Sequence, residues 1–196
     1  NLLEAARQVE LLKVIVNVTT DKCYKNNEWL WPYRENEALG GHDPYSSSKA
    51  CAEIISAAYR DSFFANNGVQ LATARAGNVI GGGDWSKDRL IPDILRSLEA
   101  NEIISIRSPS SIRPWQHVLE PVTGYILLAQ KLGQNQDVFS EAWNFGPEEN
   151  DCWSVEKIVT RVCDITQKGS WDTPVIDQPH EASLLKLDSS KAKARL

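Results

Sequence analysis

Short runs of β-branched and apolar residues alternate along the chain with segments that have the spacing and caps of helices. Residues 13–19 (KVIVNVT) are β-branched and mostly apolar, which predicts a strand buried on both faces of a parallel sheet. Residues 69–75 (VQLATAR) predict the next strand. Between them, Pro44 opens a predicted helix that Asp43 caps and that ends near residue 66. Strand, helix and strand in this order indicate a right-handed βαβ crossover.

The predicted helix over residues 44–66 carries several apolar side chains. We expect Ile54, Ile55, Ala58 and Phe63 to face inward, toward the sheet. This would make the helix an ordinary amphipathic cover of one sheet face.

The pattern changes after the three consecutive glycines at residues 81–83. Here helices, single short strands and turns follow one another. We therefore predict an α/β fold in which residues 1–80 form the back half of a doubly wound parallel sheet. Residues 81–196 would form mainly a smaller mixed α/β substrate-binding lobe, with some segments returning to the sheet. The expected elements are a helix over 90–100, two short strands within 103–118 around a turn at 109–111, a helix over 121–131, a strand over 142–145, a helix from the Ser154 cap to 166 and a helix over 189–195.

Composition narrows the class of protein. The 196 residues carry 21 Lys and Arg against 26 Asp and Glu, a net charge of −5, so the basic footprint of a nucleic-acid-binding protein is missing. The longest apolar runs fall far short of the roughly 20 residues that span a bilayer. The four cysteines have no metal-ligand spacing and predict no metal site, and they suit reduced thiols in the cytoplasm. The chain contains no Met, and we expect that it was cut from a longer chain.

The strongest chemical pattern is Tyr45-Ser46-Ser47-Ser48-Lys49 at the start of the predicted helix. Residues four apart share one helix face, so the phenol and the ammonium group point the same way. A nearby cation favours the phenolate form, which makes Tyr45 a candidate general base for a sugar or alcohol hydroxyl. Alone the pattern is weak, because Tyr and Lys four apart occur on many solvated helices.

A second polar group strengthens this hypothesis. Thr19, Thr20, Asp21 and Lys22 directly follow the first predicted strand, at the carboxyl end where open α/β sheets bind ligands. In isolation they suit an ordinary turn. One crossover before Tyr45, they favour a functional site.

Together these residues resemble a known family, the extended short-chain dehydrogenases that act on nucleotide sugars, over essentially the whole chain. The 4,6-dehydratases of that family carry Thr-Asp-Glu after this strand and Tyr-x-x-x-Lys on the next helix. Here Lys22 replaces the Glu, and with Cys23-Tyr24 and residues 113–118 (RPWQHV) this resembles the branch that acts on CDP-glucose. The resemblance implies a Rossmann-like fold whose carboxyl-terminal half is present and whose Gly-rich amino-terminal half is missing.

What the resemblance implies is an NAD-dependent lyase that converts CDP-glucose to CDP-4-keto-6-deoxyglucose for deoxysugar and O-antigen precursors. Tyr45 would take the 4-hydroxyl proton, Thr20 would bind the 4-oxygen and Asp21 would protonate the departing 6-hydroxyl. Lys49 would bind the nicotinamide ribose. Lys22 could abstract the C5 proton when neutral or stabilise the enolate as a cation, and the sequence does not choose.

The same resemblance assigns ligand contacts elsewhere in the chain. It places Thr19, Arg75 and Ala76 beside the cofactor, together with Tyr45 and Lys49. The residues expected to bind the nucleotide sugar are Asn78, Arg113, Asn144 and His180. Without the resemblance, Arg113 would be interpreted as a solvated edge charge and His180 as a structural surface residue. It also implies a homodimer that pairs through the Tyr45 helix.

Two alternatives stay open from the sequence. A nucleotide-sugar 4-epimerase or decarboxylase would need Tyr45 and Lys49 but would have no use for the Asp21 acid. A non-catalytic module could keep the Tyr45 helix as a dimerisation surface. No G-x-G-x-x-G turn follows any predicted strand, so these residues alone are not expected to hold NAD.

Overall fold

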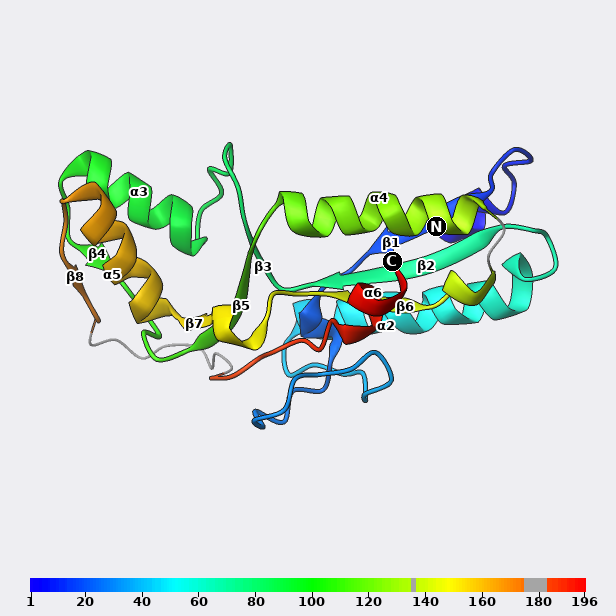
Figure 1. Cartoon of the computed structure of the whole chain (residues 1–196), viewed down its shortest axis with the longest axis horizontal. Helices are drawn as coiled ribbons and strands as arrows, with labels where there is room; N and C mark the ends of the chain where they lie inside the picture. The colour runs from blue at the N-terminus through cyan, green and yellow to red at the C-terminus, as the bar shows by residue number, and fades with distance from the viewer. Residues whose placement is uncertain (135–136, 175–182) are drawn as a thin grey trace.

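A three-stranded parallel sheet lies in the half of the molecule that also holds both termini in the computed structural model, which describes residues 1–134, 137–174 and 183–196 (Figure 1). Its strand order is β1-β2-β6, with both neighbouring pairs parallel. β1 spans Val14–Val18, β2 spans Gln70–Ala76 and β6 spans Ala142–Phe145. The parallel pairing of β1 with β2 confirms the predicted crossover, and β6 matches the predicted strand over residues 142–145.

Two helices cover the opposite faces of this sheet. α4 (Leu119–Gly133) lies on one face and α2 (Pro44–Tyr59) on the other, as Figure 1 shows. The α4 side holds an apolar core, with alternate strand residues and the helix residues Leu128 and Leu132 fully buried. Gly124 lets α4 approach closely, because an added Cβ there would lie 2.3 Å from the ring of Phe145.

The side of α2 that faces the sheet corrects the sequence prediction. Its buried residues are small or polar, namely Ser46, Ala50, Glu53 and Ser56. Ile54 and Ile55 are instead 56% and 50% exposed, and Ala58 is exposed as well. The prediction was wrong because the inward side of this helix is held by hydrogen bonds as well as by apolar packing.

The two ends of α2 are well defined. The Asp43 carboxylate accepts a hydrogen bond from the Ser46 backbone N–H at 3.0 Å, which confirms the predicted cap. At the other end the helix continues as a π-helix, Arg60–Phe64, so the helical region ends close to the predicted residue. The Phe63 ring, expected to face inward, is half-buried beneath the Arg7 guanidinium, at 3.9 Å from its ring centroid.

A second group of elements forms the other end of the molecule in Figure 1. β5 (Ile112–His117) pairs with β3 (Asn78–Ile80) in parallel and with β7 (Cys152–Ser154) antiparallel. β4 (Ile104–Ser105) pairs with β8 (Trp171–Asp172). The two strands predicted within residues 103–118 therefore exist, but each pairs with a partner elsewhere in the chain. Helices α3 (Leu90–Ala100) and α5 (Val155–Thr166) pack with β4 around buried Ile94, Ile104 and Val159.

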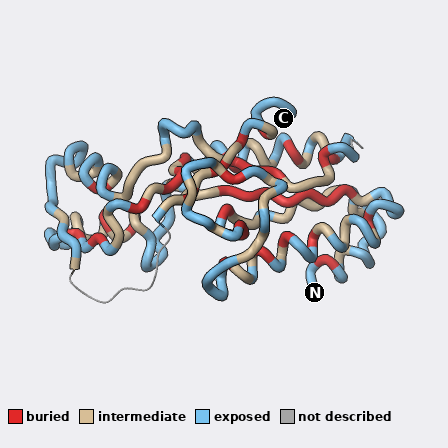
Figure 2. Tube along the Cα trace, turned by 90° about the horizontal axis from the view of Figure 1, so that it is seen from below, coloured by how far each residue is buried: buried red, intermediate tan, exposed pale blue. Residues whose placement is uncertain are grey.

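Several short elements complete the chain. Figure 2 shows that buried residues concentrate along the strands, whereas the outer sides of the helices are exposed. No helix in the described part of the chain is long and apolar enough to cross a membrane. The remaining elements are α1 (Leu2–Ala6), α6 (Ser190–Arg195) and the 3-10 helices Asp21–Cys23, Asp137–Phe139 and Glu149–Asp151.

Candidate active site

The end of β1 and the start of α2 bring the predicted catalytic side chains together. The 3-10 helix that follows β1 packs against α2, and it places the Lys22 Nζ atom 5.9 Å from the centroid of the Tyr45 ring. The Lys49 Nζ atom lies 5.6 Å from the same centroid. Tyr45 is 51% exposed. An accessible phenol near two ammonium groups can exchange a proton with a bound hydroxyl.

Asp21 is the buried acid of this site. Its side chain is 3% exposed, and Thr20 Oγ1 donates a hydrogen bond to its Oδ1 atom at 3.0 Å. Its Oδ2 atom has no hydrogen-bond partner among the described residues. Burial raises the pKa of Asp21 to about 6, against the opposing effects of the Thr20 hydrogen bond and the charges of Lys22 and Arg113. The carboxyl group therefore retains a proton in part of the population near neutral pH.

Gly77 keeps the free side of the Asp21 carboxyl open. A Cβ atom at residue 77 would lie 3.1 Å from the Asp21 Oδ2 atom and 2.4 Å from Pro114 Cγ. A glycine at this position therefore lets the end of β2 pass between the acid and β5.

Glu53 is a buried residue that the sequence analysis did not identify. Its side chain is almost fully buried and forms an ion pair with Arg75 at 2.7 Å. The same carboxylate accepts hydrogen bonds from Thr73 Oγ1 at 2.7 Å and from Thr19 Oγ1. The Thr19 hydroxyl, predicted to lie beside the cofactor, is thus directed to Glu53. The signal that could have found Glu53 is its spacing, since it follows Lys49 by four residues and so shares its helix face.

Arg75 and Asn144 lie in the core, where their polar groups bind other parts of the protein. Arg75 Nη1 donates to the Tyr24 hydroxyl at 2.9 Å and to the Glu35 backbone carbonyl at 3.0 Å. Asn144 Oδ1 accepts from the Tyr24 hydroxyl at 2.7 Å, and Asn144 Nδ2 donates to the Tyr33 carbonyl at 2.9 Å. These bonds support structural roles, and the predicted ligand contacts of both residues stay predictions.

The other predicted ligand contacts lie near the point where the two sheets meet. Ala76 ends β2, and Asn78 begins β3, where it pairs with Trp115 of β5. Arg113 is 5% exposed and donates from Nη1 to the Ile112 carbonyl at 2.9 Å. It is therefore not the solvated edge charge that the sequence would indicate without the family resemblance. His180 lies outside the described residues.

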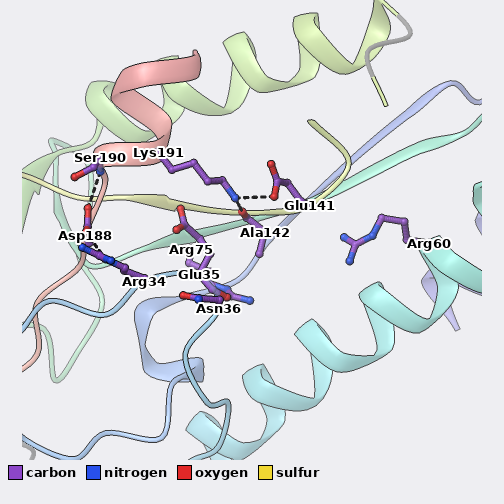
Figure 3. Close-up of a pocket in the computed structure, with 10 residues that line it drawn as sticks. All are labelled: Arg34, Glu35, Asn36, Arg60, Arg75, Glu141, Ala142, Asp188, Ser190 and Lys191. Atoms are coloured by element: carbon purple, nitrogen blue, oxygen red, sulfur yellow. Dashed lines mark hydrogen bonds and ion pairs between the residues drawn. The ribbon is translucent and has the colours of Figure 1, made fainter. Parts of the chain in front are cut away.

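A separate pocket of about 630 Å³ lies at the β6 edge of the sheet, between α2 and α6 (Figure 3). Of the predicted site residues it includes only Arg75. Its charges are largely paired, since Arg34 contacts Asp188 and Lys191 contacts Glu141, each at 3.0 Å. It is lined by Arg34, Glu35, Asn36, Arg60, Arg75, Glu141, Ala142, Asp188, Ser190 and Lys191. This pocket is therefore not the candidate catalytic site, which lies at the carboxyl end of β1.

The described residues contain no cluster of three or more His, Cys, Asp or Glu side chains that could hold a metal ion. The candidate site is thus built from a phenol, two ammonium groups, a hydroxyl and a buried carboxyl group.

Comparison with curated proteins finds a relative that is similar over the whole chain. The chain is 57% identical over 202 residues to CDP-glucose 4,6-dehydratase of Salmonella typhimurium, a match that covers 100% of this chain and 56% of the relative. The chain thus spans about half the length of that curated relative.

Solved structures show the same fold at low identity. The dTDP-glucose 4,6-dehydratase DesIV of Streptomyces venezuelae, solved with NAD bound, has a TM-score of 0.83 at 21% identity. That match covers 100% of this chain and 57% of the other. UDP-glucuronic acid 4-epimerase of Bacillus cereus has a TM-score of 0.83 at 19% identity, with 98% of this chain and 58% of the other covered. These likenesses bear out the Rossmann-type α/β fold.

The family model described as the NAD dependent epimerase/dehydratase family matches residues 1–146, which include the whole candidate site from Thr19 to Asn144. Since this match extends over most of the chain, the protein belongs to the NAD dependent epimerase/dehydratase family.

Proposed function

We propose that the protein carrying this chain is an NAD-dependent 4,6-dehydratase that converts CDP-D-glucose to CDP-4-keto-6-deoxy-D-glucose. The observation that carries the proposal is Asp21, a buried and protonatable acid on the 3-10 helix that packs against α2, the helix of Tyr45 and Lys49. A dehydratase needs an acid for the departing hydroxyl, whereas a 4-epimerase on the same scaffold does not. The 57% identity to a CDP-glucose 4,6-dehydratase supports the same choice.

In its deprotonated form, the Tyr45 side chain begins the reaction by accepting the proton of the sugar 4-hydroxyl. The Nζ atoms of Lys22 and Lys49 lie near the Tyr45 ring, at 5.9 and 5.6 Å from its centroid. Lys49, on the same helix face as Tyr45, also suits a contact with the ribose hydroxyls of NAD. When bound, NAD would supply the hydride chemistry, as acceptor of the C4 hydride and donor to C6, so the reaction would be redox-neutral overall.

Asp21 and Thr20 act in the elimination of water. The 4-ketone acidifies the C5 proton, and the Asp21 carboxyl group donates its proton to the 6-hydroxyl, which departs as water. The unoccupied hydrogen-bonding capacity of Asp21 Oδ2 and its pKa of about 6 suit this donation. The C5 proton passes either to a neutral Lys22 amine or to water while the Lys22 cation stabilises the enolate, and C5 regains a proton when hydride returns to C6.

The substrate diphosphate and the sugar would extend from this site toward β3 and β5. Buried Arg113 offers a planar fork of donors for a diphosphate, and its charge reaches Asp21. Asn78, at the start of β3, is the second proposed contact. Because the proposed catalytic residues lie within residues 1–80 and Arg113 lies beyond them, we propose a cofactor-side part over residues 1–80 and a mainly substrate-binding lobe over residues 81–196.

The proposed assembly is a homodimer formed through α2. Exposed Ile54 and Ile55 on the outer face of this helix support a buried apolar interface between two copies. We further infer a cytoplasmic enzyme that supplies deoxysugar precursors of the O-antigen.

The test is a substrate panel with the whole protein, because no G-x-G-x-x-G turn is present in these 196 residues. CDP-, dTDP-, UDP- and GDP-glucose are compared by the alkali-absorbing 4-keto product. We expect CDP-glucose to give the highest kcat/KM and the Tyr45→Phe variant to lose at least about 100-fold in turnover. An absence of turnover with CDP-glucose would overturn the proposal, and an epimerised product without loss of water would favour the epimerase alternative.

A further inference from the structure

One carboxylate joins the helix that carries Tyr45 to both neighbouring strands. Glu53 lies one turn after Lys49 and two turns after Tyr45, on the face of α2 that meets the sheet. Its Oε1 atom accepts the hydrogen bond from Thr19, which directly follows β1. Its Oε2 atom accepts from Thr73 and Arg75 of β2, each at 2.7 Å.

Apolar packing alone does not fix the position of α2 along the sheet. The sheet-facing side of the helix consists of Ser46, Ala50, Glu53 and Ser56, with no large apolar side chain among the buried residues. Directional bonds take over this task, because hydrogen bonds and ion pairs hold only at defined distances and angles. Asn17 of β1 adds another such bond, from its Nδ2 atom to Ser56 Oγ at 2.8 Å.

The hydrogen bond from Thr19 to Glu53 links the two segments that carry the candidate site, namely the residues that follow β1 and helix α2. Thr19 is followed at once by Thr20 and Asp21, whereas Glu53 is rigidly linked through α2 to Lys49 and Tyr45. Asp21 lies in the 3-10 helix after β1, whereas Tyr45 lies in α2. Of the two described side-chain hydrogen bonds between the β1 segment and α2, the Thr19–Glu53 bond is the one nearer in sequence to both residues.

We propose that Glu53 and Thr19 are positioning residues that hold the Asp21 acid at its working distance from Tyr45 and Lys49. This inference rests on the proposed dehydratase function. Proton transfers at two carbons of one sugar require both groups in register, and a displacement of about 1 Å can cost about 100-fold in rate. The Thr19 hydroxyl therefore serves the site through Glu53.

Replacing Glu53 itself would be a poor test. It would leave the buried guanidinium of Arg75 without its carboxylate, so a loss of activity would not distinguish a positioning role from a folding defect. Two threonines offer a matched pair instead. Thr19→Val and Thr73→Val each remove one hydroxyl that donates to Glu53, and each keeps the Arg75 ion pair, but only Thr19 leads into Asp21.

The experiment measures kcat, KM, bound NAD and backbone hydrogen exchange in the whole protein with these variants. We expect Thr19→Val to lower kcat about 10- to 100-fold, with KM for CDP-glucose changed less than about threefold and NAD content unchanged. Hydrogen exchange at residues 20–24 should accelerate in this variant. Thr19→Ser, which keeps the hydroxyl, should restore kcat to within about threefold of wild type, and Thr73→Val should stay within about threefold as well.

Three results would overturn the inference. Equal losses of kcat in Thr19→Val and Thr73→Val would show a merely structural role. Loss of NAD from Thr19→Val would make Thr19 a cofactor contact, and a wild-type kcat would remove any role for the bond. Failure of the proposed function would appear separately, as an inactive wild type, and hydrogen exchange would then still report whether Thr19 couples the strand end to α2.

Discussion

The two faces of the central sheet are built from different chemistry. On the α4 face, Ala72, Ala74, Leu128 and Trp143 are fully buried and make an apolar core. On the α2 face, an ion pair and several side-chain hydrogen bonds join the helix to the strands, with Glu53 at the centre. Close packing holds the helix on the apolar face, whereas the directional bonds of this polar network specify the helix position on the polar face. The helix with the candidate catalytic side chains is the one held by the network.

The largest expected effect comes from opening the network on the α2 face. Glu53→Ala leaves the Arg75 guanidinium buried without a counter-charge, which we expect to cost about 3–5 kcal/mol of unfolding free energy. Denaturant unfolding of the purified variant measures this loss. In the double variant Glu53→Leu/Arg75→Met no charge is left buried, so it should be more stable than Glu53→Ala. A double variant that loses the sum of two large single effects would contradict the network.

The matching change on the α4 face tests close packing without polar groups. We expect Gly124→Ala to lose about 1–3 kcal/mol, because the new Cβ would lie 2.3 Å from the Phe145 ring. Gly133→Ala near the end of the same helix is the control, since among the described residues its Cβ would meet only Val14, at 3.8 Å. Thermal unfolding of both variants checks this pair, and equal midpoints would mean that α4 can shift to make room.

Asp21, which lies in the 3-10 helix that packs against α2, should make the unfolding free energy of the protein depend on pH. The pKa of Asp21 is raised to about 6 from 3.8 by burial, so the folded state binds the proton more tightly than the unfolded state. The protonated acid is therefore the stable one, and stability is lost as pH rises through 6. Between pH 4.5 and 8 we expect the Asp21→Asn variant to gain about 2 kcal/mol relative to wild type. Urea unfolding at both pH values measures the difference, and a difference that does not change with pH would contradict the raised pKa.

The smallest effect is expected at the start of α2, outside the network. Asp43→Ala removes the cap bond to the Ser46 N–H and should cost about 1 kcal/mol. Asp43→Asn keeps an acceptor oxygen and should recover most of that stability. Unfolding midpoints of the two variants distinguish them, and a loss as large in Asn as in Ala would show that charge matters more than the cap bond.

Local signals explain which parts of the fold could be predicted. The β-branched run over residues 13–19 became β1, and the Asp43-Pro44 pair began α2 where expected. The strands β3, β7 and β8 were not predicted, since short strands are defined by partners far away in the chain. The inward face of α2 was misjudged because Glu53 is stabilised there by residues 20 and 34 positions away.

The candidate site shows the same division. Tyr45, Lys49 and Asp21 could be proposed from two short motifs, because spacing on a helix and the end of a strand place them at one sheet edge. The buried hydrogen bonds around these side chains could not be predicted from the sequence. Arg75 and Asn144 carry side chains that suit a ligand, and only the structure reveals that Tyr24, Tyr33 and Glu53 already bind them.

The account rests on Asp21 as the acid of a dehydration at this site. A single-turnover experiment tests it most directly, by mixing CDP-glucose with the whole protein carrying Asp21→Asn and following reduced cofactor and 4-keto-6-deoxy product separately. Asp61→Asn, on the surface beyond the end of α2, is the control. The account predicts that Asp21→Asn still reduces its cofactor but forms product at least about 100-fold more slowly, whereas the control behaves as wild type. Product formation at the wild-type rate in Asp21→Asn would contradict it.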